Sequence, residues 1–445
     1  MKRLLLIAYN FPPSTAAGVF RTARFVRWLP RRDWQVFALT IPAAPATAAA
    51  ALPDSVSVDR TAVVRPLAWL LRLRGDKNAA PATLRPGATA GSRRRAGGAG
   101  SIWTRFKDML SLVITFPDAQ VGWALTAIPR GRALVRRNKI DVLYTSGPPH
   151  SSHLIGLALH KLTGRPWVAD FRDPWARKPW VEEHERRVWR MKGIQRLERL
   201  VVRNAERVIL NTERLRADFA RNYPEIPDSH FVCIPNGYDP AEFAALPQTP
   251  RAGPFRITHA GTLYRRRNPV SLLEATRALL DQGTIRGGDI EIEFIGAVLL
   301  DGISLEEEAR RLGLGDVVTV RPAIPHAECL GKLGEADVLL AVQPDTETQI
   351  PGKLYEYLYI GKPVLALSHP GATSEFVREN GLGEVANPDA PAEVRQALAR
   401  LYLGRGSVTP SRERQRALAH HHIEALTEQL DHVLSGVTPA RAPTA

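Results

Sequence analysis

The chain has 445 residues, of which 44% are hydrophobic and 24% charged, and its formal net charge is +15. No apolar run reaches the roughly 18 residues of a membrane-spanning helix, so this composition excludes an integral membrane protein and describes a soluble globular one. The length exceeds what one ordinary hydrophobic core supports, so we expect two domains of about 200 residues each. The only cysteines are Cys233 and Cys329, which excludes a disulfide framework or a cysteine metal site and fits a reducing cytoplasm.

The positive charge is concentrated in the first half of the chain. Residues 1–240 carry a large excess of lysine and arginine, whereas residues 241–445 carry slightly more acidic than basic residues. This asymmetry indicates two domains that meet different partners. A basic half suits nucleic acid, an anionic membrane surface or a phosphorylated lipid. An arginine-rich composition from a GC-rich genome is the alternative explanation, and the many alanines and prolines favour it as well.

We interpret the apolar start, residues 3–9, as a first β-strand, because its apolar run is too short for the core of a signal peptide. A loop of small residues then leads into a helix, and residues 36–40 form a second strand. In such a βαβ unit, backbone amides at the end of the first strand approach a ligand, and Gly18 lies there. The loop is not a G-x-G-x-x-G motif, so it gives little support to NAD binding.

The rest of the first half alternates between helical and strand patterns. Residues 74–100 are rich in arginine, glycine and alanine, and we predict a mobile, basic surface insertion there. Two helical pieces broken at residues 116–118 follow, and a long basic helix ends near Asn204. The predicted strands lie at 141–145, 166–170, 207–212 and within 231–239. A helix is predicted between the first two of them, at 151–163.

The second half repeats this alternation and ends in an amphipathic helix, with a short tail, 437–445, expected to be disordered. The predicted strands lie at 255–261, 290–296, 317–320, 337–342, 363–368 and 383–386, and the predicted helices at 269–282, 326–335 and 352–360. Two successive sets of β/α units predict an α/β protein with two doubly wound, Rossmann-like parallel sheets that face a cleft. The expected domains are 1–240, 241–408 and a crossover helix, 409–436, that packs back on the first domain.

The most informative stretch is residues 351–367. A turn at Pro351-Gly352 begins a short helix, Gly361 ends it, and a buried strand follows. A helix start with Lys353 and Glu356 suits a nucleotide diphosphate: free amides and the helix dipole attract phosphate, the lysine adds charge, and the glutamate can accept from a ribose hydroxyl. A helix–strand unit with solvated charges is the alternative.

Several motifs in order resemble the family-4 retaining glycosyltransferases, which have the GT-B fold. They are PNGYD (235–239), HAGTLYRRRNP (259–269), ADVLL (336–340) and KLYEYLYIGKPVLA (353–366). In the first half, residues 9–29 resemble the amino-terminal loop of that family. SGPPHSSHLIGLALHKLTGRPWVADFRDPW resembles a subgroup associated with bacterial surface polysaccharides. Only the region around residues 74–100 lies outside the resemblance.

The resemblance implies that a sugar is transferred from a nucleotide-diphosphate sugar with retention at the anomeric carbon, with no cofactor and no metal. Lys353 matches the family's lysine beside the diphosphate, and Glu356 matches the glutamate that binds ribose. Arg266 or Arg267 falls near the basic phosphate clamp, although the family's usual Gly-Arg reads Gly261-Thr262 here. Without a metal, cations and helix amides must stabilise the leaving diphosphate.

One family residue is missing, because the position of the first glutamate of the paired-glutamate motif is Thr348. Glu347 is adjacent and could replace it, or could be an ordinary surface residue. The full set of donor-binding residues that the resemblance implies is Gly18, Gly261, Thr262, Arg266, Arg267, Glu347, Gly352, Lys353, Leu354 and Glu356.

The candidate catalytic and acceptor-binding residues lie in the first half: Asp170, Arg172, Asp173 and His150. A carboxylate in ADFRD could bind sugar hydroxyls and Arg172 a phosphate, or these charges could form a network that holds the strand end together. No carboxylate is identifiable as a nucleophile, which favours a same-face transfer assisted by the leaving phosphate.

The expected acceptor is a saccharide or a lipid-linked saccharide at the inner face of the cytoplasmic membrane. The helix around residues 175–203 combines tryptophans with arginines and fits peripheral contact with an anionic membrane. Two other readings remain open: a nucleotide-sugar 2-epimerase of the same fold and a basic nucleic-acid-binding protein, although no nucleic-acid reading surface is recognisable.

Overall fold

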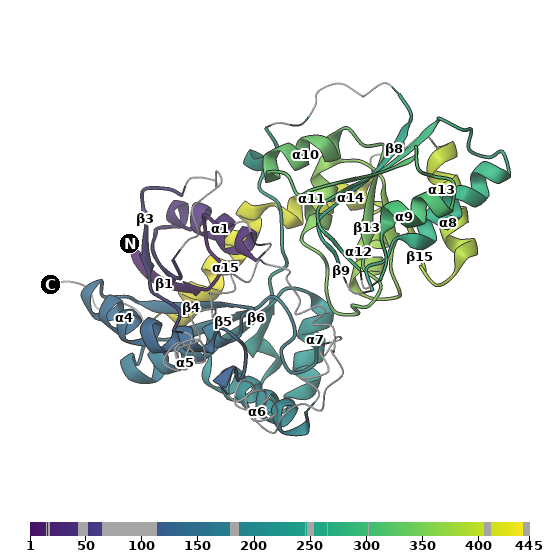
Figure 1. The fold of residues 1–445 in the computed structure, drawn as a ribbon. Coiled ribbons are helices and arrows are strands. Elements are labelled where there is room, and N and C mark those ends of the chain that lie inside the picture. The colour runs from purple at the N-terminus through teal and green to yellow at the C-terminus, as the bar shows by residue number, and fades with distance from the viewer. Residues whose placement is uncertain are drawn as a thin grey trace, which may run out of the picture. The chain divides into compact units, whose positions relative to one another are not determined.

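The computed structural model describes residues 1–14, 16, 18–42, 52–64, 114–178, 187–244, 246, 253–264, 266–300, 302–404 and 411–438. The chain forms two compact units (Figure 1). The N-terminal unit comprises Met1–Asn211, Arg216–Ile234 and Thr427–Ala445, and the C-terminal unit comprises Thr212–Leu215 and Pro235–Leu426. The predicted insertion at 74–100 and the tail beyond residue 438 lie outside the described residues.

The N-terminal unit is built on a seven-stranded parallel sheet with the strand order β3-β2-β1-β4-β5-β6-β7. Its central strands are continuous apolar runs, as expected for a sheet that is covered on both faces. The strands are β1 (Lys2–Ala8), β2 (Trp34–Thr40), β3 (Val56–Arg60), β4 (Val142–Gly147), β5 (Trp167–Phe171), β6 (Arg207–Leu210) and β7 (Phe231–Cys233).

The helices connect these strands as the alternating pattern predicts. They are α1 (Val19–Trp28), η1 (Leu29–Arg32), η2 (Val121–Trp123), α4 (Ala124–Arg137), α5 (Ser151–Thr163), α6 (Val188–Asn204), α7 (Glu213–Asn222) and η4 (Asp228–His230). None of the helices in the described ranges has both the length and the apolar composition needed to cross a lipid bilayer.

The C-terminal unit is built on a six-stranded parallel sheet, β12-β10-β8-β13-β14-β15, with a small sheet of β11 and β9 beside it. The strands are β8 (Phe255–Ala260), β9 (Leu263–Tyr264), β10 (Ile290–Ile295), β11 (Val298–Leu299), β12 (Val318–Arg321), β13 (Val338–Val342), β14 (Val364–Leu367) and β15 (Gly383–Ala386). The helices are η5 (Pro240–Phe243), α8 (Val270–Asp281), α9 (Leu305–Arg311), α10 (His326–Gly334), α11 (Lys353–Ile360), α12 (Ala372–Glu379), α13 (Pro391–Leu403) and α14 (Arg412–His421).

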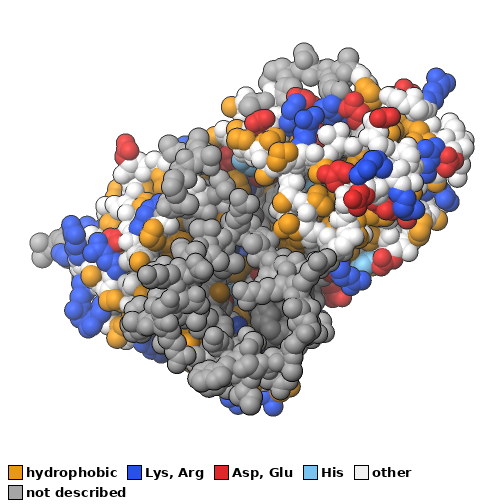
Figure 2. All heavy atoms as spheres, viewed as in Figure 1, with side chains coloured by type: hydrophobic (Ala, Val, Ile, Leu, Met, Phe, Trp, Pro, Cys, Tyr) orange, Lys and Arg blue, Asp and Glu red, His pale blue; other side chains and the backbone are white. Residues whose placement is uncertain are grey.

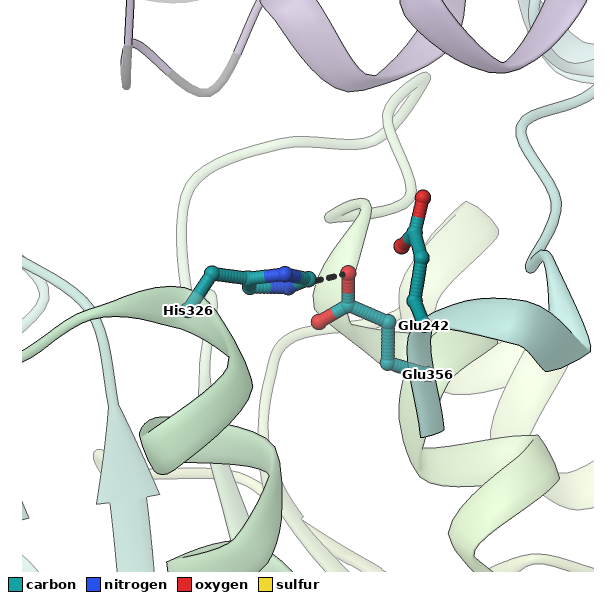
Figure 3. Close-up of side chains that lie close together, drawn as sticks. All are labelled: Glu242, His326 and Glu356. Atoms are coloured by element: carbon teal, nitrogen blue, oxygen red, sulfur yellow. Dashed lines mark hydrogen bonds and ion pairs between the residues drawn. The ribbon is translucent and has the colours of Figure 1, made fainter. Parts of the chain in front are cut away.

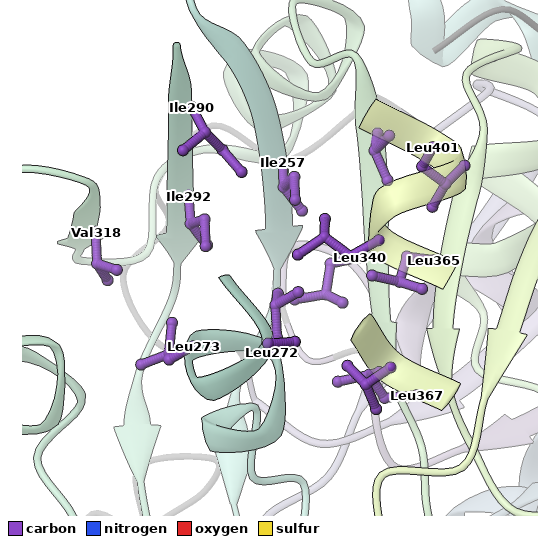
Figure 4. Close-up of a cluster of buried hydrophobic side chains, with 14 of the residues drawn as sticks. Ile257, Leu272, Leu273, Ile290, Ile292, Val318, Leu340, Leu365, Leu367 and Leu401 are labelled. Carbon is purple, nitrogen blue, oxygen red and sulfur yellow. The ribbon is translucent and has the colours of Figure 1, made fainter. Parts of the chain in front are cut away.

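Branched aliphatic side chains from the sheet and from helices α8 and α13 form the core of the C-terminal unit (Figure 4). Ile257, Leu340 and Leu365 come from three neighbouring strands, and Leu272 and Leu401 pack against them from the two helices. On the face of this unit in Figure 2, acidic and basic side chains are interspersed. This core fixes where the strands end, and the candidate site is built at those ends.

The structure confirms the two Rossmann-like sheets, and most predicted strands lie within two residues of their observed bounds. Strand β3 has no counterpart among the predicted elements. The single helix predicted at the C-terminus is wrong, because α14 ends at His421 and α15 (Ile423–Val437) begins after a break. His422 forms a β-bridge with Tyr238, and Tyr238 exchanges backbone hydrogen bonds with His421 and Ile423. These bonds take the place of helical ones.

Helix α15 packs on the N-terminal unit, as expected (Figure 1, yellow). The Trp34 indole donates to Asp431 at 2.8 Å, and the Lys2 amine donates to Ser435 at 2.5 Å. Both partners lie on one face of α15, so the last helix is anchored to the first two strands of the chain.

Candidate functional site

Lys353, the first residue of α11, lies at the carboxyl end of β8. Its Nζ donates to the carbonyl oxygen of Ala260 at 2.6 Å and lies 3.3 Å from Nε2 of His259. No salt bridge with a carboxylate is formed by Lys353 within the described ranges. Burial, together with the charge of Arg267, lowers the pKa of its amine to about 7. The structure therefore places a cation without a neutralising carboxylate at the start of a helix.

His259, on β8, is held in one tautomer by its surroundings. Its Nδ1 lies 3.0 Å from the carbonyl oxygen of Leu340 on β13, and a carbonyl can only accept, so Nδ1 carries the proton. Nε2 is then the acceptor that faces Lys353. Burial and the neighbouring charges of Lys353 and Arg267 lower the pKa of His259 well below its ordinary value. The imidazole is neutral at physiological pH.

The structure separates the two candidate arginines of the phosphate clamp. Arg266 is largely exposed and pairs with Asp345 at 3.1 Å. Arg267 lies over the ring of Tyr264, 4.5 Å from its centroid, and its charge lowers the pKa values of both Lys353 and His259. Arg267 is therefore the arginine that shares the electrostatic environment of Lys353.

Glu356, one helical turn after Lys353, lies beside His326 and Glu242 (Figure 3). His326 Nε2, at the start of α10, is 3.2 Å from the Glu356 carboxylate, and Glu242 comes from η5. One ligand atom from each of the three lies within 4.8 Å of the others, so this group has donor types that could hold a divalent cation. The hydrogen bond to His326 also orients Glu356 as an acceptor, and that arrangement needs no metal.

Gly261 follows β8 and allows the close approach of Lys353. Its φ is +117°, a conformation that residues with a Cβ rarely adopt, and a Cβ there would lie 3.1 Å from Lys353 Nζ. Gly296, after β10, packs against the Gly261 carbonyl and also borders an open cavity of about 480 Å³. The cavity is lined by Gly296, Val298, Ile303, Ser304, Glu306, Val320, Arg321 and Pro322. Lys353 and this cavity thus lie on the two sides of a glycine pair.

The other candidate donor-binding residues of the C-terminal unit differ in how far they are exposed to solvent. Gly352 is exposed, and a Cβ on it would have nothing within 4 Å. Glu347 is exposed as well, while its backbone carbonyl accepts from the amide of Ala372 at the start of α12. Thr262 is partly exposed. The side chain of Leu354 is fully buried in the hydrophobic core, so Leu354 could contact a donor only through its backbone.

In the N-terminal unit, Asp170 is a buried structural charge. Arg21 on α1 donates to both of its carboxylate oxygens, at 3.0 and 2.9 Å. Tyr144 and Ser146 on β4 donate to Oδ2 at 2.8 and 3.0 Å, and Asp170 has no exposed surface. Of the two alternatives for this strand end, the structure favours the network of charges over contact with an acceptor.

Arg172 occupies the space beside Gly18. Its Nη1 donates to the Gly18 carbonyl at 2.6 Å, and its other nitrogens donate to the carbonyls of Gly147 and Pro148. A Cβ on Gly18 would lie 2.3 Å from Nη1, so the glycine is required for this contact. Arg172 thus fastens two loops at the carboxyl ends of β1 and β4, and Asp173 beside it is partly exposed.

His150, the remaining catalytic candidate, is 3% exposed. Its ring stacks on Trp175 with 4.9 Å between the centroids, and both ring nitrogens are buried with no hydrogen-bond partner among the described residues. Burial lowers its pKa well below the ordinary value, as does the neighbouring His153. An acceptor could reach this ring only if the packing around it opened.

Two family models match the chain and together cover more than half of it. The model described as Glycosyltransferase Family 4 matches residues 103–242, and the model described as Glycosyl transferases group 1 matches residues 254–403. The chain belongs to the family-4 glycosyltransferases. Both matches lie where the motifs of the sequence resemble this family.

This glycosyltransferase is similar to the D-inositol 3-phosphate glycosyltransferase of Streptomyces scabiei, with 30% identity over 213 residues. The match covers 44% of this chain and 46% of that relative, so the chain spans about half the length of the curated relative it matches.

Solved structures support the GT-B fold of the glycosyltransferase. The sucrose-phosphate synthase of Thermosynechococcus elongatus matches with a TM-score of 0.65 and 15% identity, over 98% of this chain and 99% of that one. Anabaena HepE in complex with UDP and glucose matches with a TM-score of 0.61 and 13% identity, over 98% and 100%. At these identities the likeness shows the fold.

Three residues of the site are absent from the sequence-based set: His259, which contacts Lys353, and His326 and Glu242, which lie beside Glu356. His259 lies inside the motif HAGTLY at a predicted strand end, and that position is the only signal the sequence carries for it. His326 lies at the predicted start of α10, where a histidine is equally compatible with the surface.

Proposed function

We propose that this protein is a retaining, metal-independent glycosyltransferase that uses a nucleotide-diphosphate sugar. The observation that carries the proposal is Lys353, a cation at the start of α11 that forms no salt bridge with a carboxylate of the described residues, with Arg267 close enough to lower its pKa. Such a site is suited to the negative charge that develops on a leaving diphosphate. Glu356 one turn later supplies an acceptor for a ribose hydroxyl.

The transfer itself would follow a same-face route. The bond between the anomeric carbon and the diphosphate oxygen breaks, the bond to the acceptor oxygen forms on the same face, and the acceptor's proton passes to the departing phosphate oxygen. Lys353 and the first amides of α11 would stabilise the charge on that phosphate. Asp170 has no part in this route, since its oxygens are occupied by Arg21, Tyr144 and Ser146.

We further propose that the acceptor is a saccharide or lipid-linked saccharide of a surface polysaccharide, reached at an anionic membrane. Helix α6 supports this, because Val188, Trp189 and Met191 are exposed beside basic residues. A cavity of about 310 Å³ between α6 and α7 is lined by Arg177, Lys192, Gln195, Arg196, Arg199, Asn222 and Tyr223. Apolar and cationic side chains together suit lipid headgroups. Sedimentation with anionic but not with zwitterionic vesicles would support the contact.

The decisive experiment is a panel of UDP-, GDP- and ADP-sugars, with binding measured by calorimetry and turnover measured on lipid-linked acceptors. Lys353→Ala removes a charge-assisted hydrogen bond to phosphate, so we expect affinity to fall by about 10- to 100-fold. Lys362→Ala, two residues beyond the end of α11, is the matched control and should bind as the wild type does. Unchanged binding by Lys353→Ala would refute the site.

The finer parts of the proposal have separate readouts. The anomeric configuration of the product, determined by NMR, decides between retention and inversion. Turnover in a chelator decides whether the group formed by Glu242, His326 and Glu356 needs a metal. Release of a free epimer in place of a glycoside would favour the 2-epimerase instead.

A further inference from the structure

Buried His259 and partly buried Lys353 form a pair of nitrogen bases in which one residue orients the other. We propose that His259 is a positioning residue that holds the Lys353 amine for the donor diphosphate, and that Lys353 takes up a proton when the nucleotide sugar binds. This inference rests on the proposed function, because it describes how the same site would recognise its donor.

The geometry fixes the role of each ring nitrogen. The Leu340 carbonyl on β13 engages Nδ1 of His259 at 3.0 Å, so the ring cannot turn without losing a buried hydrogen bond. Nε2 then presents its lone pair to Lys353 Nζ at 3.3 Å. The Ala260 carbonyl accepts from the same Nζ at 2.6 Å. The amine is thereby held by two acceptors from consecutive residues of one rigid strand.

The number of hydrogen-bond acceptors around the Lys353 amine matches its neutral form. A neutral amine has two N–H groups, and the two acceptors satisfy both of them. An ammonium has a third N–H, and no third acceptor for it is present in the part of the chain that the structure describes. A phosphate oxygen would supply that acceptor. The site is complete without a ligand when Lys353 is neutral, and complete with a diphosphate when Lys353 is charged.

Of Lys353 and His259, Lys353 is the residue that changes protonation near neutral pH, and the charged groups around it set its pKa. Arg267 from the loop after β9 opposes its charge, while Cys329 from α10 and Glu356 from α11 favour it. Burial and Glu356 raise the pKa of the Cys329 thiol to about 11, and burial raises that of Tyr357 on α11. His326 from α10 contacts Glu356.

The sign of the pH dependence follows from linkage. Below about pH 7 the free protein already carries the ammonium, so binding takes up no proton at Lys353 and affinity is constant. Above that pH each binding event must bring one proton, and affinity falls by up to about tenfold per pH unit. Both phosphates of a nucleotide sugar are esterified, so the ligand itself does not titrate in this range.

The test measures calorimetric affinity for UDP-glucose, GDP-mannose and ADP-glucose between about pH 6 and about pH 9. Two variants of His259 each retain one of the two hydrogen bonds that its ring makes. His259→Gln places an acceptor oxygen near the position of Nε2, whereas His259→Asn keeps a donor for Leu340 and loses the acceptor for Lys353. Lys353→Arg carries a charge at every pH in the range and removes the titration.

We expect wild type and His259→Gln to show the same pH profile, and His259→Asn to bind at least about tenfold more weakly with its decline moved to lower pH. Lys353→Arg should give a flat profile. Thermal unfolding of each variant separates loss of fold from loss of positioning.

Two outcomes would overturn the inference while leaving the proposed function intact: His259→Asn with the wild-type profile, or a decline that persists in Lys353→Arg and therefore belongs to another group such as His326. If none of the three sugar nucleotides binds at any pH, the proposed function fails and this inference fails with it.

Discussion

Arg21 in the N-terminal unit is a buried cation and Lys353 in the C-terminal unit a partly buried one. Both lie near the ends of parallel strands, and their hydrogen-bonding groups are satisfied in different ways. Arg21 makes two hydrogen bonds to Asp170 and one to the carbonyl of Ile234, and burial is outweighed by Asp170, so its pKa is raised. Lys353 has two neutral acceptors and a pKa lowered to about 7.

The difference separates structural charges from charges that await a ligand. A buried ion pair with every donor and acceptor engaged is complete in the folded chain, and a substrate could contact it only by breaking it. A cation that is partly buried and keeps an unused N–H group is only partly stabilised by the protein, and an anion can supply the missing acceptor. This criterion favours the start of α11 as the site of the proposed function and the ion pair of Asp170 with Arg21 as part of the scaffold.

The largest expected effect is on the structural side of this comparison. Asp170→Asn leaves the Arg21 guanidinium buried without its counter-charge, and we expect a loss of about 3–5 kcal/mol in the free energy of unfolding. Denaturant titration measures it. Asp59→Asn breaks the exposed pair with Arg130 and should cost less than about 1 kcal/mol.

If Asp170→Asn does not fold, the stability of the double variant Arg21→Met/Asp170→Leu is measured instead. Removing both charges leaves no buried ion unpaired, so the double variant should recover much of the lost stability. A stable Asp170→Asn protein that binds nucleotide but fails only in turnover would return Asp170 to the catalytic set.

The sequence predicts the scaffold well where burial is continuous. Apolar runs such as LLLIA and VLLAV form central strands, since only a strand covered on both faces is apolar throughout. Strand β3 is missed because VSVDR is a short edge strand with mostly polar, half-exposed residues. The break at His422 is missed because its cause is a backbone bridge to Tyr238, far away in sequence.

The site is predictable only in the residues whose function a local motif encodes. Lys353 and Glu356 follow from a helix start, and the structure places them together. The partner of Asp170 is Arg21, 149 residues away, and the role of His259 depends on Leu340, 81 residues away. Such pairings arise from the strand order of the sheet, which a single sequence does not display.

A smaller effect is expected from two glycines near Lys353: Gly261, which lies beside its amine, and Gly352, which precedes it in the chain. Gly261→Ala places a residue with a Cβ at a backbone φ of +117°, and the new Cβ lies 3.1 Å from Lys353 Nζ. We therefore expect a loss of about 1–3 kcal/mol in the free energy of unfolding and weaker nucleotide binding. Gly352→Ala has a helical φ of −54° and open space, so its stability should change by less than about 0.5 kcal/mol.

Binding distinguishes the two glycine variants. If the diphosphate lies against the start of α11, the new methyl group of Gly352→Ala occupies ligand space and weakens affinity by about tenfold without loss of stability. Calorimetry beside thermal unfolding reports both quantities. Normal affinity in Gly352→Ala would place the diphosphate elsewhere on the unit.

The smallest effect concerns Glu347, an exposed carboxylate that makes no side-chain hydrogen bond in the described structure and whose charge helps to raise the pKa of Arg214. If it replaces the glutamate missing at Thr348, its oxygens accept from hydroxyls of the donor sugar. Glu347→Gln should then weaken binding of the sugar nucleotide by about three- to tenfold and leave binding of the nucleoside diphosphate unchanged.

Glu379→Gln, at the exposed end of α12, is the control for loss of a surface charge. Equal losses for both ligands in Glu347→Gln would mean that the carboxylate acts through the general electrostatic potential. In that case its lack of a hydrogen-bond partner reflects solvation. An unsatisfied charge would then indicate a ligand site only where the protein removes part of it from solvent, as it does for Lys353.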